Sequence, residues 1–135
     1  MHMQGTPENM QIDPSYDNVT GEVSEFLNKK ILDSIESGIL KESIIIDPGI
    51  GFGKNINQNL TLLKNLDKFT KVHPTLIGLS RKSFIGKIIG EKDPKGRLAG
   101  SLGATAFSII QGTHILRVHD VKETRDVCEI FKHLH

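Results

Sequence analysis

Three short apolar runs alternate with helical patterns along the chain, and this alternation restricts the fold more than any other feature. The runs cover residues 44–46, 75–79 and 114–118, and polar or glycine residues follow each of them directly. Continuous apolar runs of this length are typical of strands that are buried on both faces of a parallel sheet. The helices between them can supply the crossovers that parallel strands need. The sequence therefore predicts an α/β fold.

Helical periodicity marks five segments, in which apolar residues recur every three or four positions. We predict helices over approximately residues 18–37, 60–69, 83–89, 98–111 and 121–134. In the last of these, Val121, Val127 and Ile130 are expected to face the core. No internal repeat divides the chain, and its length is that of one domain, so residues 1–135 are assigned to a single α/β unit.

Composition excludes several classes of protein. Seventeen Lys and Arg against 16 Asp and Glu leave a net charge of +1, so no global field attracts nucleic acid. No run reaches the roughly 18 apolar residues of a membrane span, and the N-terminus lacks a signal-peptide pattern. A single cysteine, Cys128, excludes an internal disulfide and a cysteine-based zinc site. We therefore expect a cytoplasmic protein that binds neither nucleic acid nor membranes.

Polar residues after the third apolar run are candidates for an anion site, because parallel α/β folds bind ligands at the carboxyl ends of their strands. Side chains alternate along a strand, so Arg117 and His119 share one face while Leu116 and Val118 share the other. A buried guanidinium is unfavourable without a partner. The pair is expected to bind an anionic ligand, and the alternative is an internal salt bridge to a neighbouring carboxylate.

The same alternation after the second run places Gly78, Ser80 and Lys82 on one face, with Ser83 at or near the start of the next helix. Free backbone N–H groups and the helix dipole favour a carboxylate or phosphate there. The alternatives are that Ser83 is an ordinary helix cap and that Arg81 and Lys82 lie in a solvated turn.

Asp47 ends the first run within an Asp-Pro-Gly sequence. Its carboxylate can accept two hydrogen bonds from the edge of an amidine-like heterocycle, although Asp-Pro-Gly is also an ordinary turn. The glycine-rich segment 49–54 fits neither a P-loop, because Pro48 stands where glycine is required, nor the Rossmann spacing. We expect its glycines to let the backbone approach a ligand and to present Phe52.

Four segments in this order resemble the dihydropteroate synthase family. They are MHMQG at residues 1–5, DPGIGFGK at 47–54, SRKS at 80–83 and RVHDV at 117–121. The family is a TIM-like (β/α)8 barrel of folate biosynthesis and the target of sulfonamides. Its members are transferases that join (7,8-dihydropterin-6-yl)methyl diphosphate to 4-aminobenzoate and release diphosphate. The resemblance implies these two small molecules as partners, a homodimer for the complete enzyme, and Mg²⁺ as cofactor.

The resemblance also assigns roles to individual residues. The implied pterin-binding residues are Asp47, Lys82, Gly78 and Phe52, of which Asp47 and Lys82 are catalytic. The implied 4-aminobenzoate-binding residues are Ser83, Arg81 and Phe52. The implied diphosphate-binding residues are Arg117, His119 and Ser80. No metal ligand is assigned in this chain, because the Mg²⁺ ligands are expected in the N-terminal half of the barrel.

Length is the main departure from the family, since such a barrel takes about 250 residues and this chain has 135. Its first motif lies at the end of the fifth strand in the family. We therefore expect the chain to cover about the last half of the barrel, from the end of strand 5 to helix 8, and to be inactive alone. The alternatives are a pterin-binding methyltransferase barrel and a half-barrel that acts only as an assembly or binding partner.

Overall fold

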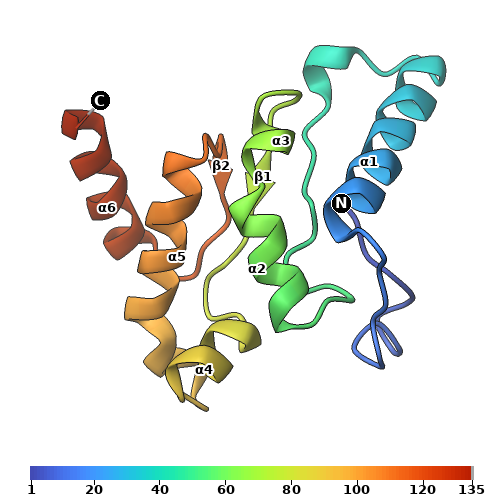
Figure 1. Ribbon diagram of the computed structural model, residues 1–135. Helices are drawn as coiled ribbons and strands as arrows, with labels where there is room; N and C mark the ends of the chain where they lie inside the picture. Colours follow the sequence, from blue (N-terminus) through green and yellow to red (C-terminus); the bar gives the residue numbers. More distant parts are fainter. Residues whose placement is uncertain (135) are drawn as a thin grey trace.

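A short parallel sheet lies at the centre of the fold in the computed structural model, which describes residues 1–134 (Figure 1). Strand β1 (Leu76–Ile77) pairs in parallel with β2 (Ile115–Leu116). Ile46 adds an isolated parallel bridge to Thr75, so the three apolar runs lie side by side. The prediction of parallel strands alternating with helices is thereby confirmed.

The first apolar run is not a regular strand, contrary to the prediction. Only Ile46 exchanges backbone hydrogen bonds with the neighbouring segment, donating to Pro74 and accepting from Leu76. The backbone N–H of Ile44 instead donates to Lys41, in the short 3₁₀ helix η1 (Lys41–Ser43). The preceding 3₁₀ turn therefore limits pairing to a single bridge, and Ile45 is 51% exposed.

All five predicted helices are present, and the second is divided in two. The helices are α1 (Val19–Glu36), α2 (Ile56–Lys64), α3 (Asp67–Thr70), α4 (Ser83–Ile89), α5 (Leu98–Ile110) and α6 (Val121–Leu134), with a second 3₁₀ helix, η2 (Pro94–Arg97). Helix α2 begins before its first predicted apolar residue, because Asn55 and Gln58 form a reciprocal capping box there. No helix among residues 1–134 is long and apolar enough to cross a membrane.

The core lies between the helices and the sheet. Its most completely buried apolar side chains come from the loop after Ile46, helix α2 and the residues after it, and β1 with the two residues that follow: Ile50, Leu62, Leu66, Ile77 and Leu79. Helix α1 adds Val23 and Leu27, and α4 adds Phe84 and Ile85. This packing fixes the segments on which the strand-end loops are mounted.

Helix α6 does not face the core as predicted. Val121 is 65% and Ile130 is 63% exposed, Val127 is partly buried, and Thr124 is the buried residue of the helix. Helix α6 lies at one end of the row of helices and packs against α5 (Figure 1). Only one strip of its surface is therefore covered, and the apolar residues outside this strip stay exposed.

Candidate active site

Three loops meet beyond the carboxyl ends of the parallel segments. They follow Ile46, β1 and β2, and they contain the Asp-Pro-Gly, Ser-Arg-Lys-Ser and Arg-Val-His-Asp sequences. Side chains join them directly: Lys82 donates to the carbonyl of Ile50, and Arg81 pairs with Asp120. The structure therefore brings the predicted strand-end residues to one edge of the sheet, as parallel pairing requires.

Side chains hold the backbone of the glycine loop, which we define as residues 49–53. Each of its five carbonyl oxygens accepts a hydrogen bond from a side chain. Lys54 donates to Gly49 at 3.0 Å and to Phe52 at 2.8 Å, Lys82 donates to Ile50 at 2.5 Å, Gln11 donates to Gly51 at 2.8 Å, and the Tyr16 hydroxyl donates to Gly53 at 2.8 Å. The buried Asn59 also accepts from the N–H of Gly51 at 2.7 Å. The loop is therefore shaped by the protein before any ligand binds.

Two glycines of this loop pack against the protein itself, which differs from the expectation that they approach a ligand. Gly49 has φ +70°, and a Cβ there would lie 1.7 Å from the carbonyl oxygen of His2. Gly53 has φ +62°, and a Cβ there would lie 2.6 Å from the carbonyl oxygen of Gln4. Both positions need glycine because the loop is pressed onto the N-terminal segment.

Lys54 and His2 are structural members of the site that the sequence patterns did not identify. Lys54 is 3% exposed, and its ammonium lies 3.0 Å from Nδ1 of His2. Burial lowers the pKa of Lys54 to about 8, an effect that Asp47 opposes and Lys82 reinforces. Burial, with the charge of Lys54, lowers the pKa of His2 to about 4, so the imidazole is neutral at pH 7. The contact spans 52 positions in the sequence, and no local spacing reveals it.

Asp47 makes the turn contact and keeps one carboxylate oxygen without a partner in the described part of the chain. Its Oδ1 accepts from the N–H of Gly49 at 2.7 Å, which is the turn contact, and its backbone carbonyl accepts from His2 at 3.0 Å. Its Oδ2 accepts no hydrogen bond from residues 1–134. The carboxylate is therefore oriented through one oxygen, and the other oxygen is available to a ligand.

Lys82 is a partly buried cation and does not lie in a solvated turn. Its Nζ lies 4.1 Å from the centroid of the Phe52 ring, which is a cation–π contact. Burial lowers the pKa of Lys82 to about 8, Arg117 lowers it further, and Asp47 opposes both effects. Lys82 also occupies the N-cap position of α4, so Ser83 is the first helical residue and its hydroxyl does not cap the helix. Ser83 is exposed.

Arg81 is fixed by contacts from three directions. Its guanidinium forms a two-pronged ion pair with Asp120, through Nε to Oδ2 at 3.1 Å and through Nη2 to Oδ1. This contact lowers the pKa of the Asp120 carboxyl. The backbone of Arg81 has φ +60°, and it is held by Ser101 at its N–H and by Arg97 at its carbonyl. Arg81 therefore joins the loops after β1 and β2.

Arg97 also ties the segment between α4 and α5 to this loop. Its other N–H groups donate to the carbonyls of Glu91 at 3.2 Å and Lys92 at 2.5 Å. Gly86 makes room for the guanidinium, since a Cβ there would lie 2.3 Å from Nε of Arg97. The position of Arg81 therefore depends on residues outside the strand-end loops.

Arg117 and His119 differ in how the protein holds them. The guanidinium of Arg117 crosses Gly78, where a Cβ would lie 3.0 Å from Nη2, and it forms no ion pair within residues 1–134. The ring Nδ1 of His119 lies 3.0 Å from Oγ of Ser80, which also accepts from the His119 backbone at 3.2 Å. The nearby carboxylate, Asp120, pairs with Arg81. Arg117 is therefore a free cation, and Ser80 orients the histidine. Both side chains are exposed in this chain, contrary to the expected burial of the guanidinium.

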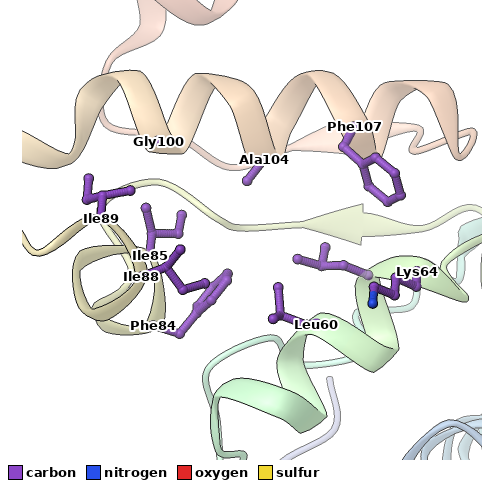
Figure 2. Close-up of a pocket in the computed structure, with 10 residues that line it drawn as sticks. Leu60, Lys64, Phe84, Ile85, Ile88, Ile89, Gly100, Ala104 and Phe107 are labelled. Carbon is purple, nitrogen blue, oxygen red and sulfur yellow. The ribbon is translucent and has the colours of Figure 1, made fainter.

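A separate apolar pocket of about 330 Å³ lies between α2, α4 and α5 (Figure 2). Figure 2 shows side chains of these three helices facing one another, among them Leu60, Phe84 and Phe107. None of the strand-end candidates lines it. Within the part of the chain that the structure describes, no group of three His, Cys, Asp or Glu side chains is placed to hold a metal ion.

The parallel sheet defines an α/β protein, and its carboxyl edge carries an acid, one buried lysine, one partly buried lysine and a free arginine. The family model for pterin binding enzymes matches residues 1–119, and the chain belongs to this family. It is 45% identical to the dihydropteroate synthase of Escherichia coli (strain K12) over 131 residues, which are 96% of this chain and 46% of that protein.

Solved structures show the same similarity. The Yersinia pestis dihydropteroate synthase, solved with a sulfonamide drug, matches with a TM-score of 0.95 at 39% identity, over 98% of this chain and 48% of that one. The Xanthomonas albilineans dihydropteroate synthase, solved with 7,8-dihydropteroate, matches with a TM-score of 0.88 at 40% identity, over 90% of this chain and 47% of that one. The chain therefore spans about half the length of the relatives it matches.

The buried ammonium of Lys54 predicts a specific dependence of stability on pH. Its pKa is about 8 in the folded protein against 10.5 when exposed, so between these values the unfolded chain binds more protons. The free energy of unfolding should therefore gain a contribution that rises from pH 8 to about pH 10.5, by at most about 1.4 kcal/mol per pH unit. Lys54→Met should remove this contribution, whereas Lys64→Met, at an exposed lysine of α2, should leave it in place. Urea unfolding at several pH values measures it, and identical slopes for wild type and Lys54→Met would contradict it.

Proposed function

We propose that this chain carries the pterin, 4-aminobenzoate and diphosphate sites of a cytoplasmic dihydropteroate synthase, a transferase of folate biosynthesis. The observation that carries the proposal is the meeting of Asp47, Lys82 and Arg117 at one sheet edge, with Lys82 over the Phe52 ring. An oriented carboxylate suits the amino-pyrimidine edge of a pterin, and unpaired cations suit a diphosphate. The similarity to enzymes of this name in Escherichia coli and Xanthomonas albilineans supports the same reaction.

In the proposed reaction, the aniline nitrogen of 4-aminobenzoate attacks the methylene carbon of the pterin. A C–N bond forms, the C–O bond to diphosphate breaks, and the nitrogen loses one proton. The free Oδ2 of Asp47 accepts hydrogen bonds from the pterin, while Lys82 contacts the ring, next to Gly78. Arg117 and His119 stabilise the negative charge that develops on the leaving group. Ser80 supports this role by orienting His119.

The 4-aminobenzoate site is proposed between Phe52, Arg81 and Ser83. The Phe52 ring supplies an apolar face, and the exposed hydroxyl of Ser83 can donate to the carboxylate. Arg81 has five N–H groups, and two of them are used on Asp120, so the others remain for a ligand. Holding the amine against the pterin methylene makes the attack effectively intramolecular.

The unpaired cations favour this reaction over a pterin-binding methyltransferase. A methyl donor gives the protein no diphosphate to bind, whereas Arg117 has no carboxylate partner within residues 1–134 and Lys82 is partly buried. Mg²⁺ is proposed as a cofactor from the resemblance alone. The described residues bring no set of metal ligands together, so no residue of this chain and no step is assigned to the ion.

We further propose that the chain supplies the end of strand 5 to helix 8 of a (β/α)8 barrel, and that the complete enzyme is a homodimer. Two observations support the barrel: the matches cover about half of each relative, and Ile45 and Ile115 are 51% and 37% exposed at the sheet. A two-stranded sheet is marginal by itself. Further strands would cover these side chains and close the edges.

Asp47→Asn should weaken pterin binding in the intact protein. The amide presents an NH₂ where the pterin needs an acceptor, and the loss of a charged hydrogen-bonded pair typically costs about 1.5 to 3 kcal/mol, or roughly a tenfold or greater loss of affinity. Titration calorimetry with the pterin diphosphate measures the effect. Asp33→Asn, on the exposed face of α1, is the control. An unchanged affinity for Asp47→Asn would reject the role of this carboxylate.

Arg117→Ala and His119→Ala should impair diphosphate binding and turnover more than 4-aminobenzoate binding, because they remove the guanidinium and the imidazole that face the leaving group. Ser83→Ala should have a smaller effect, directed at 4-aminobenzoate, since the backbone N–H groups of α4 remain. Product inhibition by diphosphate and the KM values of both substrates separate the two patterns. If Arg117→Ala leaves diphosphate inhibition intact, the assignment must be abandoned.

The 135-residue chain alone should show no synthase activity and should self-associate, because its sheet leaves apolar edges open. Mixing it with a polypeptide that corresponds to the N-terminal half of the Escherichia coli relative should reduce association and restore pterin binding. Light scattering and a synthase assay test both points. A monomer that turns over substrate unaided would contradict the half-barrel proposal and the alternative of a pure assembly partner alike.

A further inference from the structure

Lys54 is a buried cation with no carboxylate at hydrogen-bonding distance. Its ammonium has three N–H groups, and these face Nδ1 of His2 at 3.0 Å, the carbonyl of Gly49 at 3.0 Å and the carbonyl of Phe52 at 2.8 Å. The side chain is 3% exposed, so it does not reach a ligand in the strand-end site. All of its hydrogen-bonding capacity is therefore directed at the protein.

Two of these contacts join the two ends of the turn formed by residues 49–52. The N–H of Phe52 already donates to the carbonyl of Gly49 at 3.0 Å, and Lys54 binds the carbonyls of the same two residues. A methionine of similar length would fill the space without the cost of burying a charge, but it would leave two carbonyls without these donors. The benefit of a lysine here is therefore the geometry that it imposes on the turn.

The third contact connects this turn to helix α1. Since the ammonium donates, Nδ1 of His2 is the unprotonated nitrogen of the ring. The His2 ring packs edge-on against Phe26 of α1, with centroids 4.9 Å apart. A continuous chain of contacts thus runs from helix α1 through His2 and Lys54 to the glycine loop. It supports the end of the loop that carries Phe52.

We propose that Lys54 is a positioning residue, which fixes the Phe52 ring at the 4-aminobenzoate site without touching either substrate. Lys82 also donates to Ile50 and lies over the Phe52 ring. Lys54 therefore holds the backbone of Phe52, and Lys82 contacts its ring. The role of Phe52 toward 4-aminobenzoate rests on the proposed synthase function, whereas the support of the loop does not.

The test compares Lys54→Met with wild type and with Lys64→Met, a control at an exposed lysine of α2. In the intact protein, Lys54→Met should raise the KM for 4-aminobenzoate by about tenfold or more, since misplacement by about 1 Å can cost a hundredfold. The KM for the pterin diphosphate should change less than threefold. Amide hydrogen exchange at Gly51, Phe52 and Gly53 should accelerate, while exchange at Leu62 and Ile77 in the core stays slow.

Several outcomes would overturn the proposal. One is that Lys54→Met keeps the wild-type KM for 4-aminobenzoate and the wild-type rate of amide exchange in the loop. Another is that its KM rises equally for both substrates and amide exchange accelerates throughout the core. If Lys54→Met does not fold, Lys54→Gln, which keeps one amide donor, is judged by the same criteria. If the wild-type chain makes no dihydropteroate even when the N-terminal half of the barrel is supplied, the proposed function fails. Amide hydrogen exchange in the loop of Lys54→Met then tests the positioning role by itself. Faster exchange in the loop alone would support this role, and unchanged exchange would overturn it.

Discussion

Parallel pairing of three short segments is the constraint on which the site depends. Ile46, β1 and β2 run in the same direction, so the loops that follow them leave the sheet at one edge. Because this pairing is brief, the loops are not held by long strands. They are held by side chains that cross between them, such as Lys82 on Ile50 and Arg81 on Asp120. The site is therefore assembled by polar contacts above a small sheet.

Those contacts place more positive than negative charge at the edge. Lys54 and Lys82 lie near the carboxylate of Asp47, whose field stabilises the charge of both lysines, and Arg117 lies near Lys82. The other carboxylate at this edge, Asp120, is paired with Arg81. Burial disfavours the charged form of both lysines, and because this effect exceeds that of Asp47, their pKa values are lowered. A ligand that brings its own negative charge would relieve this imbalance, which is the electrostatic reason for favouring a diphosphate.

Local sequence patterns were sufficient to predict the helices, the parallel sheet and the loops that meet at its edge. Periodicity predicts the helices, and the carboxyl ends of parallel strands meet at one edge of the sheet. The patterns overestimated the strand before Asp47, where a 3₁₀ turn limits pairing, and they misplaced Val121 and Ile130 of α6, which packs along one strip. Which face of a helix or strand is buried depends on the element that packs against it, and the sequence does not reveal that neighbour.

The residues that support the glycine loop escaped prediction for the same reason. His2, Gln11 and Tyr16 reach it from a segment some forty to fifty positions away, and Asn59 turns back from α2. None of them stands in a recognisable spacing. The glycines signalled a special backbone, but only the structure shows that the close approach at Gly49 is to His2.

The guanidinium of Arg97 has a consequence for how such a protein can change over evolutionary time. It holds the carbonyl of Arg81 and, with its remaining N–H groups, the carbonyls of Glu91 and Lys92. A substitution or insertion in that outer segment alters where Arg81 stands without replacing any residue that meets a ligand. For the proposed 4-aminobenzoate site, selection for discrimination between this substrate and its structural mimics would therefore have a second target, in a surface stretch that would ordinarily be regarded as free to drift.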